Sequence, residues 1–164
     1  MAADRVSKEN YYLDIAQTVS ERSTCLRRRF GAIIVKNDTI VSTGYNGAPR
    51  GRENCNELGS CYRETLGIPR GERYELCRSV HAEANAIIAA PREQMLGATL
   101  YLCCTSPVDG SVMPGTTSCM MCKKLVINSG ISRVIVRDDA EHFREIEVWG
   151  WITDDDSLGG KFGY

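Results

Sequence analysis

The fold class is indicated first by one stretch of sequence, Phe30-Gly-Ala-Ile-Ile-Val-Lys-Asn-Asp-Thr-Ile-Val-Ser-Thr43. Its two apolar runs, Phe30 to Val35 and Thr39 to Thr43, are rich in β-branched residues and are typical of strands. The polar link Lys36-Asn37-Asp38 between them is short, which predicts an antiparallel hairpin. A β-sheet therefore begins with these residues.

Helices and further strands flank this hairpin. Ser7 is a candidate N-cap for a helix to about Glu21, and its apolar face would comprise Tyr11, Tyr12, Ile15, Ala16 and Val19. After the hairpin, apolar periodicity and turn residues predict a helix, a strand, a helix and a strand at residues 80–90, 98–103, 119–128 and 131–137. This order predicts an α/β fold with a mixed sheet flanked by helices, in a single domain of residues 1–164.

Two segments do not follow this periodicity. Residues 44–79 form a long insert that contains six glycines, six arginines and three cysteines. A loop of that length is unusual in a compact domain unless it is functional or held in place by something. The tail, residues 138–164, is acidic, and we expect Trp149 and Trp151 to dock it onto the body.

Charge and hydropathy exclude several classes of protein. The apolar fraction of 43% and the charged fraction of 25% are ordinary for a globular domain, and no apolar run is long enough to span a membrane. A net charge of −1 argues against broad binding to nucleic acid. The N-terminus lacks the apolar core of a secretory signal, so we expect a cytoplasmic location. Eight cysteines in that setting indicate metal binding or catalysis rather than a disulfide framework.

The chemistry is indicated by His81-Ala-Glu83 and Cys119-Met-Met-Cys122, each at the start of an expected helix. One imidazole and two thiolates supply three zinc ligands and leave the fourth tetrahedral position open for water, as in catalytic zinc sites. Zinc deaminases of nucleobases use this set of residues, with the glutamate moving protons rather than binding the metal. The alternative is a closed, four-ligand structural zinc site in which Glu83 is an ordinary carboxylate at the start of a helix.

Other segments fall into one pattern with this motif, namely Ser23-Thr-Cys25, Gly31 to Lys36, Ser42 to Gly47, Glu75-Leu-Cys77, His81 to Ala86, Gly97 to Tyr101 and Ile127 to Ile131. Together they resemble the deoxycytidylate deaminase family over most of residues 7–137. The resemblance implies a cytidine-deaminase-like three-layer α/β/α sandwich with a mixed five-stranded sheet. It also implies the zinc-dependent conversion of dCMP to dUMP and ammonia, with dCTP as activator and dTTP as inhibitor.

The same resemblance implies roles for single residues. The catalytic zinc would be held by His81, Cys119 and Cys122, and Glu83 would carry protons. Asn46 and the backbone of Ala82 would contact the nucleotide substrate, and effectors would involve Gly44, Tyr45, Asn46 and Gly47. By resemblance, Mg²⁺ would accompany triphosphate effectors, and the protein would be a homo-oligomer, with a hexamer expected.

The remaining cysteines have two interpretations. Some members of the family carry a second, structural zinc, and its ligands here would be Cys25, Cys55, Cys61 and Cys77. The alternative is four reduced thiols. Cys103 and Cys104 end an expected strand, and we expect both to pack in the core.

The sequence leaves several points open. The family usually has proline where this chain has Ser118, and the loop between Cys104 and Cys119 is longer than usual. The substrate phosphate could be held by Arg50, Arg52, Arg63, Arg70, Arg73 or Arg78, and the run Arg27-Arg28-Arg29 could hold a phosphate as well. We expect His142 at the surface. The alternative functions are a deaminase for another cytosine nucleoside or nucleotide, and a non-catalytic nucleotide-binding relative.

Overall fold

A five-stranded mixed sheet forms the centre of the computed structural model, which describes residues 4–154. The strands lie in the order β2-β1-β3-β4-β5. Their bounds are Arg29–Lys36 for β1, Thr39–Tyr45 for β2, Thr99–Thr105 for β3, Arg133–Arg137 for β4 and Phe143–Glu147 for β5. Only β3 and β4 are parallel, and α6 makes the crossover between them, whereas the other three pairs are antiparallel.

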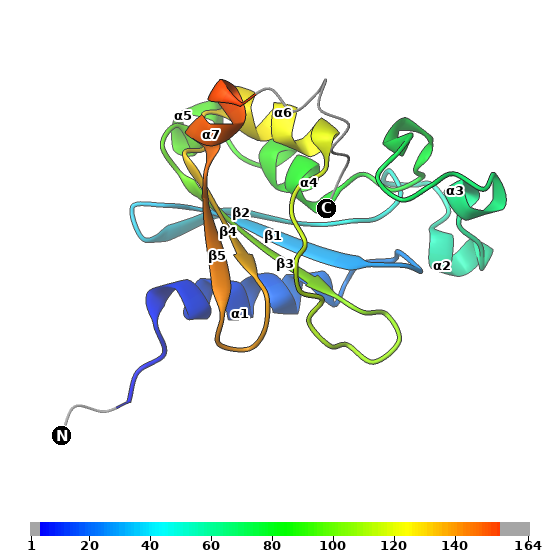
Figure 1. Ribbon diagram of the computed structural model, residues 1–164, viewed down its shortest axis with the longest axis horizontal. Coiled ribbons are helices and arrows are strands. Elements are labelled where there is room, and N and C mark those ends of the chain that lie inside the picture. Colours follow the sequence, from blue (N-terminus) through cyan, green and yellow to red (C-terminus); the bar gives the residue numbers. More distant parts are fainter. Residues whose placement is uncertain (1–3, 155–164) are drawn as a thin grey trace.

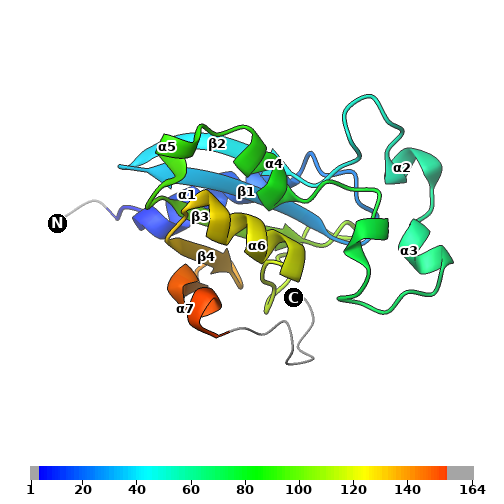
Figure 2. The same ribbon diagram turned by 90° about the horizontal axis from the view of Figure 1, so that it is seen from above.

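Helices cover both faces of the sheet (Figure 1). One face packs on α1 (Lys8–Ser20), and the other lies under α4 (Ala82–Ile88), α5 (Arg92–Met95), α6 (Met120–Ser129) and α7 (Val148–Thr153). Viewed from above, α4 and α6 lie next to each other over the strands (Figure 2). This arrangement confirms the predicted three-layer α/β/α sandwich. Within residues 4–154, no helix has the length and apolar character needed to cross a bilayer.

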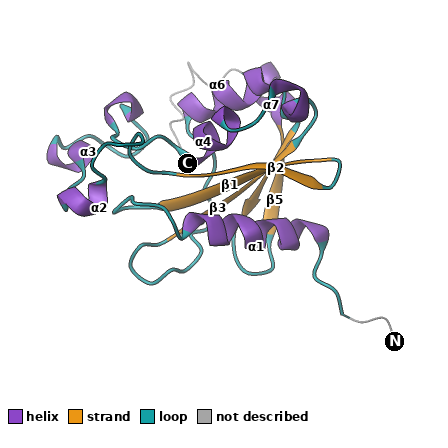
Figure 3. Ribbon diagram, turned by 180° about the vertical axis from the view of Figure 1, so that it is seen from behind, coloured by secondary structure: helices purple, strands orange, loops and turns teal. Residues whose placement is uncertain are grey.

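The insert is more ordered than its sequence predicts. It contains two short helices, α2 (Cys55–Leu58) and α3 (Tyr62–Thr65), and a 3₁₀ turn, η1 (Tyr74–Leu76). These elements extend beyond one end of the sheet, away from the layers that cover its faces (Figure 3). Helices of a single turn are too short to produce a periodic apolar pattern in the sequence. The sequence therefore predicts a loop where the structure has these short helices.

Strand β1 contributes to two separate cores because its side chains alternate between the faces of the sheet. Ala32 and Ile34 pack with residues of α4 and α6, and Ile33 and Val35 pack with residues of α1. Gly31 permits close contact with α1, since a Cβ atom at this position would lie 2.1 Å from the carbonyl oxygen of Ala16. The antiparallel hairpin is confirmed, and its turn places Asn37 and Asp38 at φ values of 50° and 60°, as a two-residue type I′ turn requires.

The N-terminal helix and the tail each correct one expectation. Ser7 caps α1 as predicted, accepting a hydrogen bond from the amide of Asn10 at 3.1 Å. Tyr11 does not belong to the apolar face of α1, because its side chain is exposed, and Leu13 is fully buried in its place. In the tail, Trp151 packs against the core, but Trp149 is 68% exposed and does not dock anything. The expected tail also contains β5 and α7, and its last residues, 155–164, lie outside the described residues.

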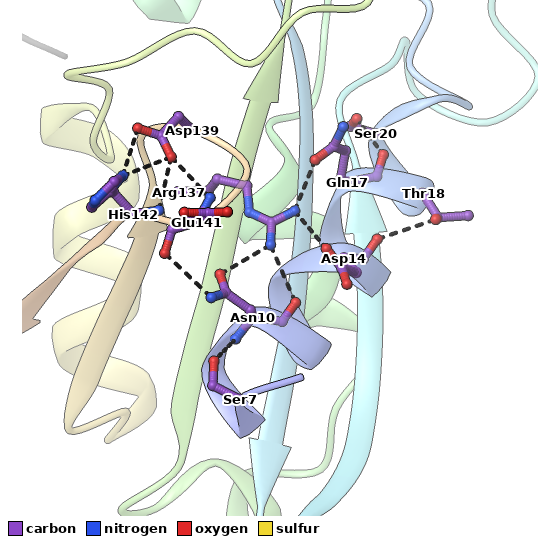
Figure 4. A network of polar contacts seen from close by, with 10 residues as sticks. All are labelled: Ser7, Asn10, Asp14, Gln17, Thr18, Ser20, Arg137, Asp139, Glu141 and His142. Carbon is purple, nitrogen blue, oxygen red and sulfur yellow. Dashed lines mark hydrogen bonds and ion pairs between the residues drawn. The ribbon is translucent and has the colours of Figure 1, made fainter. Parts of the chain in front are cut away.

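A buried arginine ties α1 to the sheet (Figure 4). Arg137, at the end of β4, is 2% exposed, and its guanidinium donates to the side chain of Gln17 at 2.9 Å and to the backbone and side-chain oxygens of Asn10 at 3.2 Å. It also forms an ion pair with Asp14 at 2.8 Å. His142 lies near this network and pairs with Asp139 at 2.9 Å, on the surface as expected. Because α1 supplies nearly all of these partners, Arg137 fixes the position of that helix on the strands.

Candidate metal and catalytic site

Three candidate ligands converge where two helices begin. His81 is the N-cap residue of α4, Cys119 is the N-cap residue of α6, and Cys122 lies in the first turn of α6. The Nδ1 atom of His81 is 3.4 Å from the Sγ atom of Cys119 and 3.5 Å from that of Cys122. In the described part of the chain, this is the one group of three or more His, Cys, Asp or Glu residues whose ligand atoms all lie within 4.8 Å of one another.

These distances fit a tetrahedral zinc ion. With Zn–N and Zn–S bonds of the usual lengths, the nitrogen and each sulfur would be separated by about 3.6 Å. No fourth histidine, cysteine or carboxylate among residues 4–154 joins the group. The geometry therefore favours a three-ligand site with an open position over a closed, four-ligand structural site.

The two thiols share their protons unequally. The hydrogen bond with Cys122, together with the nearby imidazole of His81, lowers the pKa of Cys119 to about 4, although burial acts in the opposite direction. The same hydrogen bond and burial raise the pKa of Cys122. Both cysteines lie at the N-terminal end of α6, where backbone N–H groups favour negative charge on their sulfurs.

Glu83 lies in the first turn of α4, two residues after His81. Its side chain is 3% exposed, and burial raises the pKa of its carboxyl group, with the charge on His81 acting in the opposite direction. Glu83 does not belong to the ligand group. A buried carboxyl group beside a metal site, with a raised pKa, is suited to accept and return protons near neutral pH.

A cavity of about 210 Å³ opens onto these groups. Its walls include Phe30, Asn46, Ala82 and the four arginines Arg27, Arg28, Arg63 and Arg70. Of the six arginines proposed from the insert, only Arg63 and Arg70 therefore line the cavity. Arg27 and Arg28 come from the segment before β1. The sequence predicts that the run Arg27-Arg28-Arg29 could hold a phosphate but does not link it to the cavity. An apolar ring and several cations around one buried carboxylate suit a small, anionic, aromatic ligand.

Asn46 is held in the cavity wall by its own hydrogen bonds. Its Oδ1 atom accepts from the amide of Phe30 at 2.9 Å, and its Nδ2 atom donates to the carbonyl of Arg28 at 2.9 Å. Because a side-chain amide carries two N–H donors, one N–H of Asn46 remains for a ligand. The side chain is 6% exposed, so its orientation is fixed before a ligand binds.

The segment Gly44 to Gly47 is attached to the helix that carries Glu83. A Cβ atom on Gly44 would lie 2.3 Å from the carbonyl oxygen of Ala82, so only glycine allows β2 to approach α4 this closely. Gly47 exchanges two backbone hydrogen bonds with Val80, at 2.7 and 3.2 Å. Asn85 donates from its side chain to the carbonyl of Tyr45 at 2.8 Å. A displacement of this segment would therefore move the start of α4.

The other cysteines divide into two sets. Cys25, Cys61 and Cys77 surround Cys55 loosely; burial raises the pKa of the Cys55 thiol, and the three neighbouring thiols raise it further. They do not form a compact ligand group of the kind seen at His81. Cys103 and Cys104 are fully buried core residues, as predicted, and burial raises the pKa of each to about 12.

Comparison with known proteins agrees with this geometry. Residues 6–138 match the family model described as the cytidine and deoxycytidylate deaminase zinc-binding region. The chain is 37% identical to the deoxycytidylate deaminase of Mycobacterium phage D29 over 132 residues, covering 77% of this chain and 91% of that protein. It is 34% identical to the deoxycytidylate deaminase of Schizosaccharomyces pombe over 131 residues, covering 80% of this chain but only 37% of the yeast protein.

The fold is similar to that of a crystal structure as well. The dCMP deaminase of cyanophage S-TIM5, in complex with dCMP and dUMP, aligns with a TM-score of 0.56 and 26% identity. The alignment covers 83% of this chain and 85% of the phage protein.

Proposed function

The chain belongs to the cytidine and deoxycytidylate deaminase family, and we propose that it removes the amino group of dCMP by hydrolysis to give dUMP and ammonia. The observation that carries this proposal is the three-ligand group of His81, Cys119 and Cys122, beside the buried carboxyl group of Glu83, at the end of a cavity lined by arginines. The relatives in yeast and phage D29 have the same named activity, and the cyanophage structure is a complex with both substrate and product.

The reaction requires a nucleophilic water molecule and the transfer of protons to the cytosine ring. Zinc bound by His81, Cys119 and Cys122 would lower the pKa of a water molecule at its open position to about 7. Glu83 would take a proton from the attacking water and give it to the ring nitrogen next to the carbon that bears the amino group, while the water oxygen bonds to that carbon. It would then take the proton of the new hydroxyl group and give it to the amino group, which leaves as ammonia when the carbon–nitrogen bond breaks and the carbonyl forms. Since Glu83 is the one carboxylate among the cavity-lining residues, it serves every one of these transfers.

The base and sugar would be oriented by groups that are already fixed. The remaining N–H of Asn46 can donate to the nucleotide, and the backbone of Ala82, at the start of α4, can meet the pyrimidine. Phe30 supplies apolar surface to the same cavity. Orientation by groups that do not have to move lowers the entropic cost of reaching the reactive geometry.

The arginines of the cavity account for a phosphate on the substrate. Arg63 is buried and donates to the carbonyls of Pro69 and Glu72, so its guanidinium is fixed within the insert. Arg27 and Arg28 are half-buried and Arg70 is exposed, and Arg27 also pairs with Glu64 at 2.9 Å. These three residues line the cavity and provide the positive charge that a monophosphate needs. Arg27, Arg28 and Arg70, rather than the other arginines of the insert, are our candidates for selecting dCMP over deoxycytidine.

Regulation by dCTP and dTTP would act through Gly44, Tyr45, Asn46 and Gly47. The contacts of this segment with Val80, Ala82 and Asn85 support that role, because they connect it to the residues on either side of His81 and Glu83. Mg²⁺ would accompany the triphosphates. The hexameric assembly stays a prediction from the family resemblance, and the cytoplasmic location stays a prediction from the N-terminal sequence.

A structural zinc at Cys25, Cys55, Cys61 and Cys77 also stays a prediction. Cys25, Cys61 and Cys77 each lie near enough to Cys55 to raise its pKa, and this proximity supports the site. Metal analysis of the purified protein tests it directly, because two zinc ions per chain are expected with this site and one without it. A count of one ion in protein purified without chelator would rule the second site out.

The substrate assignment is tested by ammonia release from dCMP, CMP, deoxycytidine and dCTP, each with and without dCTP or dTTP as effector. We expect dCMP to have the highest kcat/KM. Replacing Arg70 by methionine should raise KM for dCMP and leave the low rate with deoxycytidine unchanged. Equal turnover of dCMP and deoxycytidine would refute the monophosphate assignment, and a higher rate with another cytosine nucleotide would identify that compound as the substrate instead.

A further inference from the structure

One arginine organises the insert that closes the cavity. Arg63, in α3, is 4% exposed, and its guanidinium donates to the carbonyl of Pro69 at 2.9 Å and to that of Glu72 at 2.7 and 3.1 Å. The guanidinium carbon also lies 4.2 Å from the centre of the Tyr74 ring. A single buried cation thus fixes the turn at residues 69–72 and the aromatic ring that follows it.

The 3₁₀ turn η1 then directs two side chains to one place. Side chains three residues apart in a 3₁₀ turn lie on the same side, so Tyr74 and Cys77 project together. The turn is closed by a hydrogen bond from the amide of Cys77 to the carbonyl of Tyr74 at 2.9 Å. Both residues pack in one small buried cluster with Cys119 and Cys122.

The side chain of Tyr74 packs against the imidazole of His81. The ring of Tyr74 lies edge-on to the imidazole, with 5.3 Å between ring centres and 80° between ring planes. Cys77 packs against the cluster that Tyr74 forms with Cys119 and Cys122. It is outside the group of three ligands, whose sulfurs both face the Nδ1 atom of His81. It therefore lies beside the ligand group without being a fourth ligand.

We propose that Arg63 and Tyr74 form a clamp that holds the imidazole ring of His81 in the orientation needed to bind the metal. Tyr74 is a positioning residue, and Arg63 acts through Tyr74. This inference builds on the proposed function, because it gives the insert a role in the same zinc site. It also explains why a long segment with little periodicity is folded: its contacts support a ligand that α4 itself holds only through an N-cap position.

Groups that fix a metal-binding histidine contribute to metal retention and to activity, and their loss costs about 10–100-fold in either. In the zinc-loaded, full-length protein, Tyr74→Leu should therefore speed the transfer of zinc to a chelator by about 10-fold. The same variant should lower kcat for dCMP by a similar factor and leave KM within about 3-fold, because the ring orients a ligand rather than the substrate. Tyr74→Phe keeps the ring and should restore most of the zinc retention.

The matched control is Tyr62→Leu. Tyr62 lies in the same insert and is 54% exposed, so this identical substitution should leave zinc transfer unchanged. Arg63→Met should speed zinc transfer as well, and it should add little in a protein that already carries Tyr74→Leu, because both act through one contact. Neither Tyr74 nor Arg63 is among the three ligands. The transfer is followed for the zinc that turnover requires, by recording the loss of activity in withdrawn samples together with the zinc released, so a zinc elsewhere in the insert is counted separately.

Zinc transfer is measured without substrate, which separates this proposal from the substrate assignment. Faster transfer from Tyr74→Leu supports the clamp even if dCMP proves not to be the substrate. Unchanged transfer in a folded Tyr74→Leu protein that deaminates dCMP would overturn the clamp alone, as would a rise in KM at constant kcat. If Tyr74→Leu does not fold, Arg63→Lys takes its place, since lysine keeps the charge without the planar donors; transfer at the wild-type rate would then be the refuting result.

Discussion

Replacing Glu83 by glutamine removes the proton carrier and leaves the shape of the site intact. General acid–base catalysis by one side chain contributes about 10²–10⁴-fold. The upper part of this range applies here, because among the described residues the cavity has no second carboxylate and its histidine is a proposed metal ligand. We expect kcat to fall by about 10³–10⁴-fold, equivalent to about 4–5.5 kcal/mol in activation free energy.

Other properties of this variant should not decline. Glutamine has nearly the volume of glutamate, and the ligands are untouched, so zinc content and the affinity for dUMP should stay close to wild type. Without metal, burial raises the pKa of Glu83, so the fold favours its protonated form and its ionisation at neutral pH costs stability. In the metal-free protein, the neutral amide should therefore leave the melting temperature equal or higher.

The assay combines single-turnover deamination of dCMP, zinc analysis and thermal denaturation of both proteins. Turnover within 10-fold of wild type, in protein that retains zinc, would refute the assignment of Glu83 as the proton carrier. Loss of zinc together with activity would show instead that the carboxylate belongs to the metal site. A wild-type protein with zinc but no turnover of any cytosine nucleotide would indicate the non-catalytic relative.

Three further predictions concern the fold. Arg137→Met should lower the free energy of unfolding in urea by about 3 kcal/mol, because it breaks several partly buried hydrogen bonds of a buried guanidinium. Arg133→Met breaks a partly exposed ion pair and should cost less than about 1 kcal/mol. Gly44→Ala should cost about 1–3 kcal/mol and reduce activity, because the new methyl group would meet the backbone of α4; Gly150→Ala, with open space around it, is the control in thermal denaturation. Burial holds the pKa of Cys103 at about 12, so its thiol stays protonated in the folded protein while the unfolded chain ionises above about pH 9. Stability should accordingly fall as the pH rises from 9 to 12, and a flat profile in urea titrations over that range would contradict this account.

The sequence predicts well the elements whose conformation depends on interactions between residues close together in the chain. Ser7 caps a helix by reaching its own backbone, and the Asn37-Asp38 turn adopts its conformation within two residues. Gly130 ends α6 in the left-handed conformation, as its position after the apolar periodicity predicts. The ligand motifs belong to this class too, because both open helices that the periodicity itself reveals.

The features that the sequence does not predict depend on distant partners. The segment that forms β5 is polar and alternates charges around Ile146, so its pairing with β4 leaves no apolar pattern to detect. Arg137 is a charged residue that would be assigned to the surface, and only the arrangement of α1 provides acceptors for it. Likewise, Tyr74 and His81 are seven positions apart with a 3₁₀ turn between them, and no spacing rule predicts that their rings meet.

The two edge strands of the sheet, β2 and β5, affect whether two copies of the protein can associate through their sheets. An edge strand can recruit a strand from another molecule unless charges, bulges or short length prevent it. β5 is five residues long and carries Arg144, Glu145 and Glu147, and the pairing of β2 with β1 is irregular between Ile34 and Val35. Both borders thus carry features that discourage continuation of the sheet into a neighbour. Assembly of the intact protein should therefore use its helices and loops, and fibril growth through the native sheet should be disfavoured.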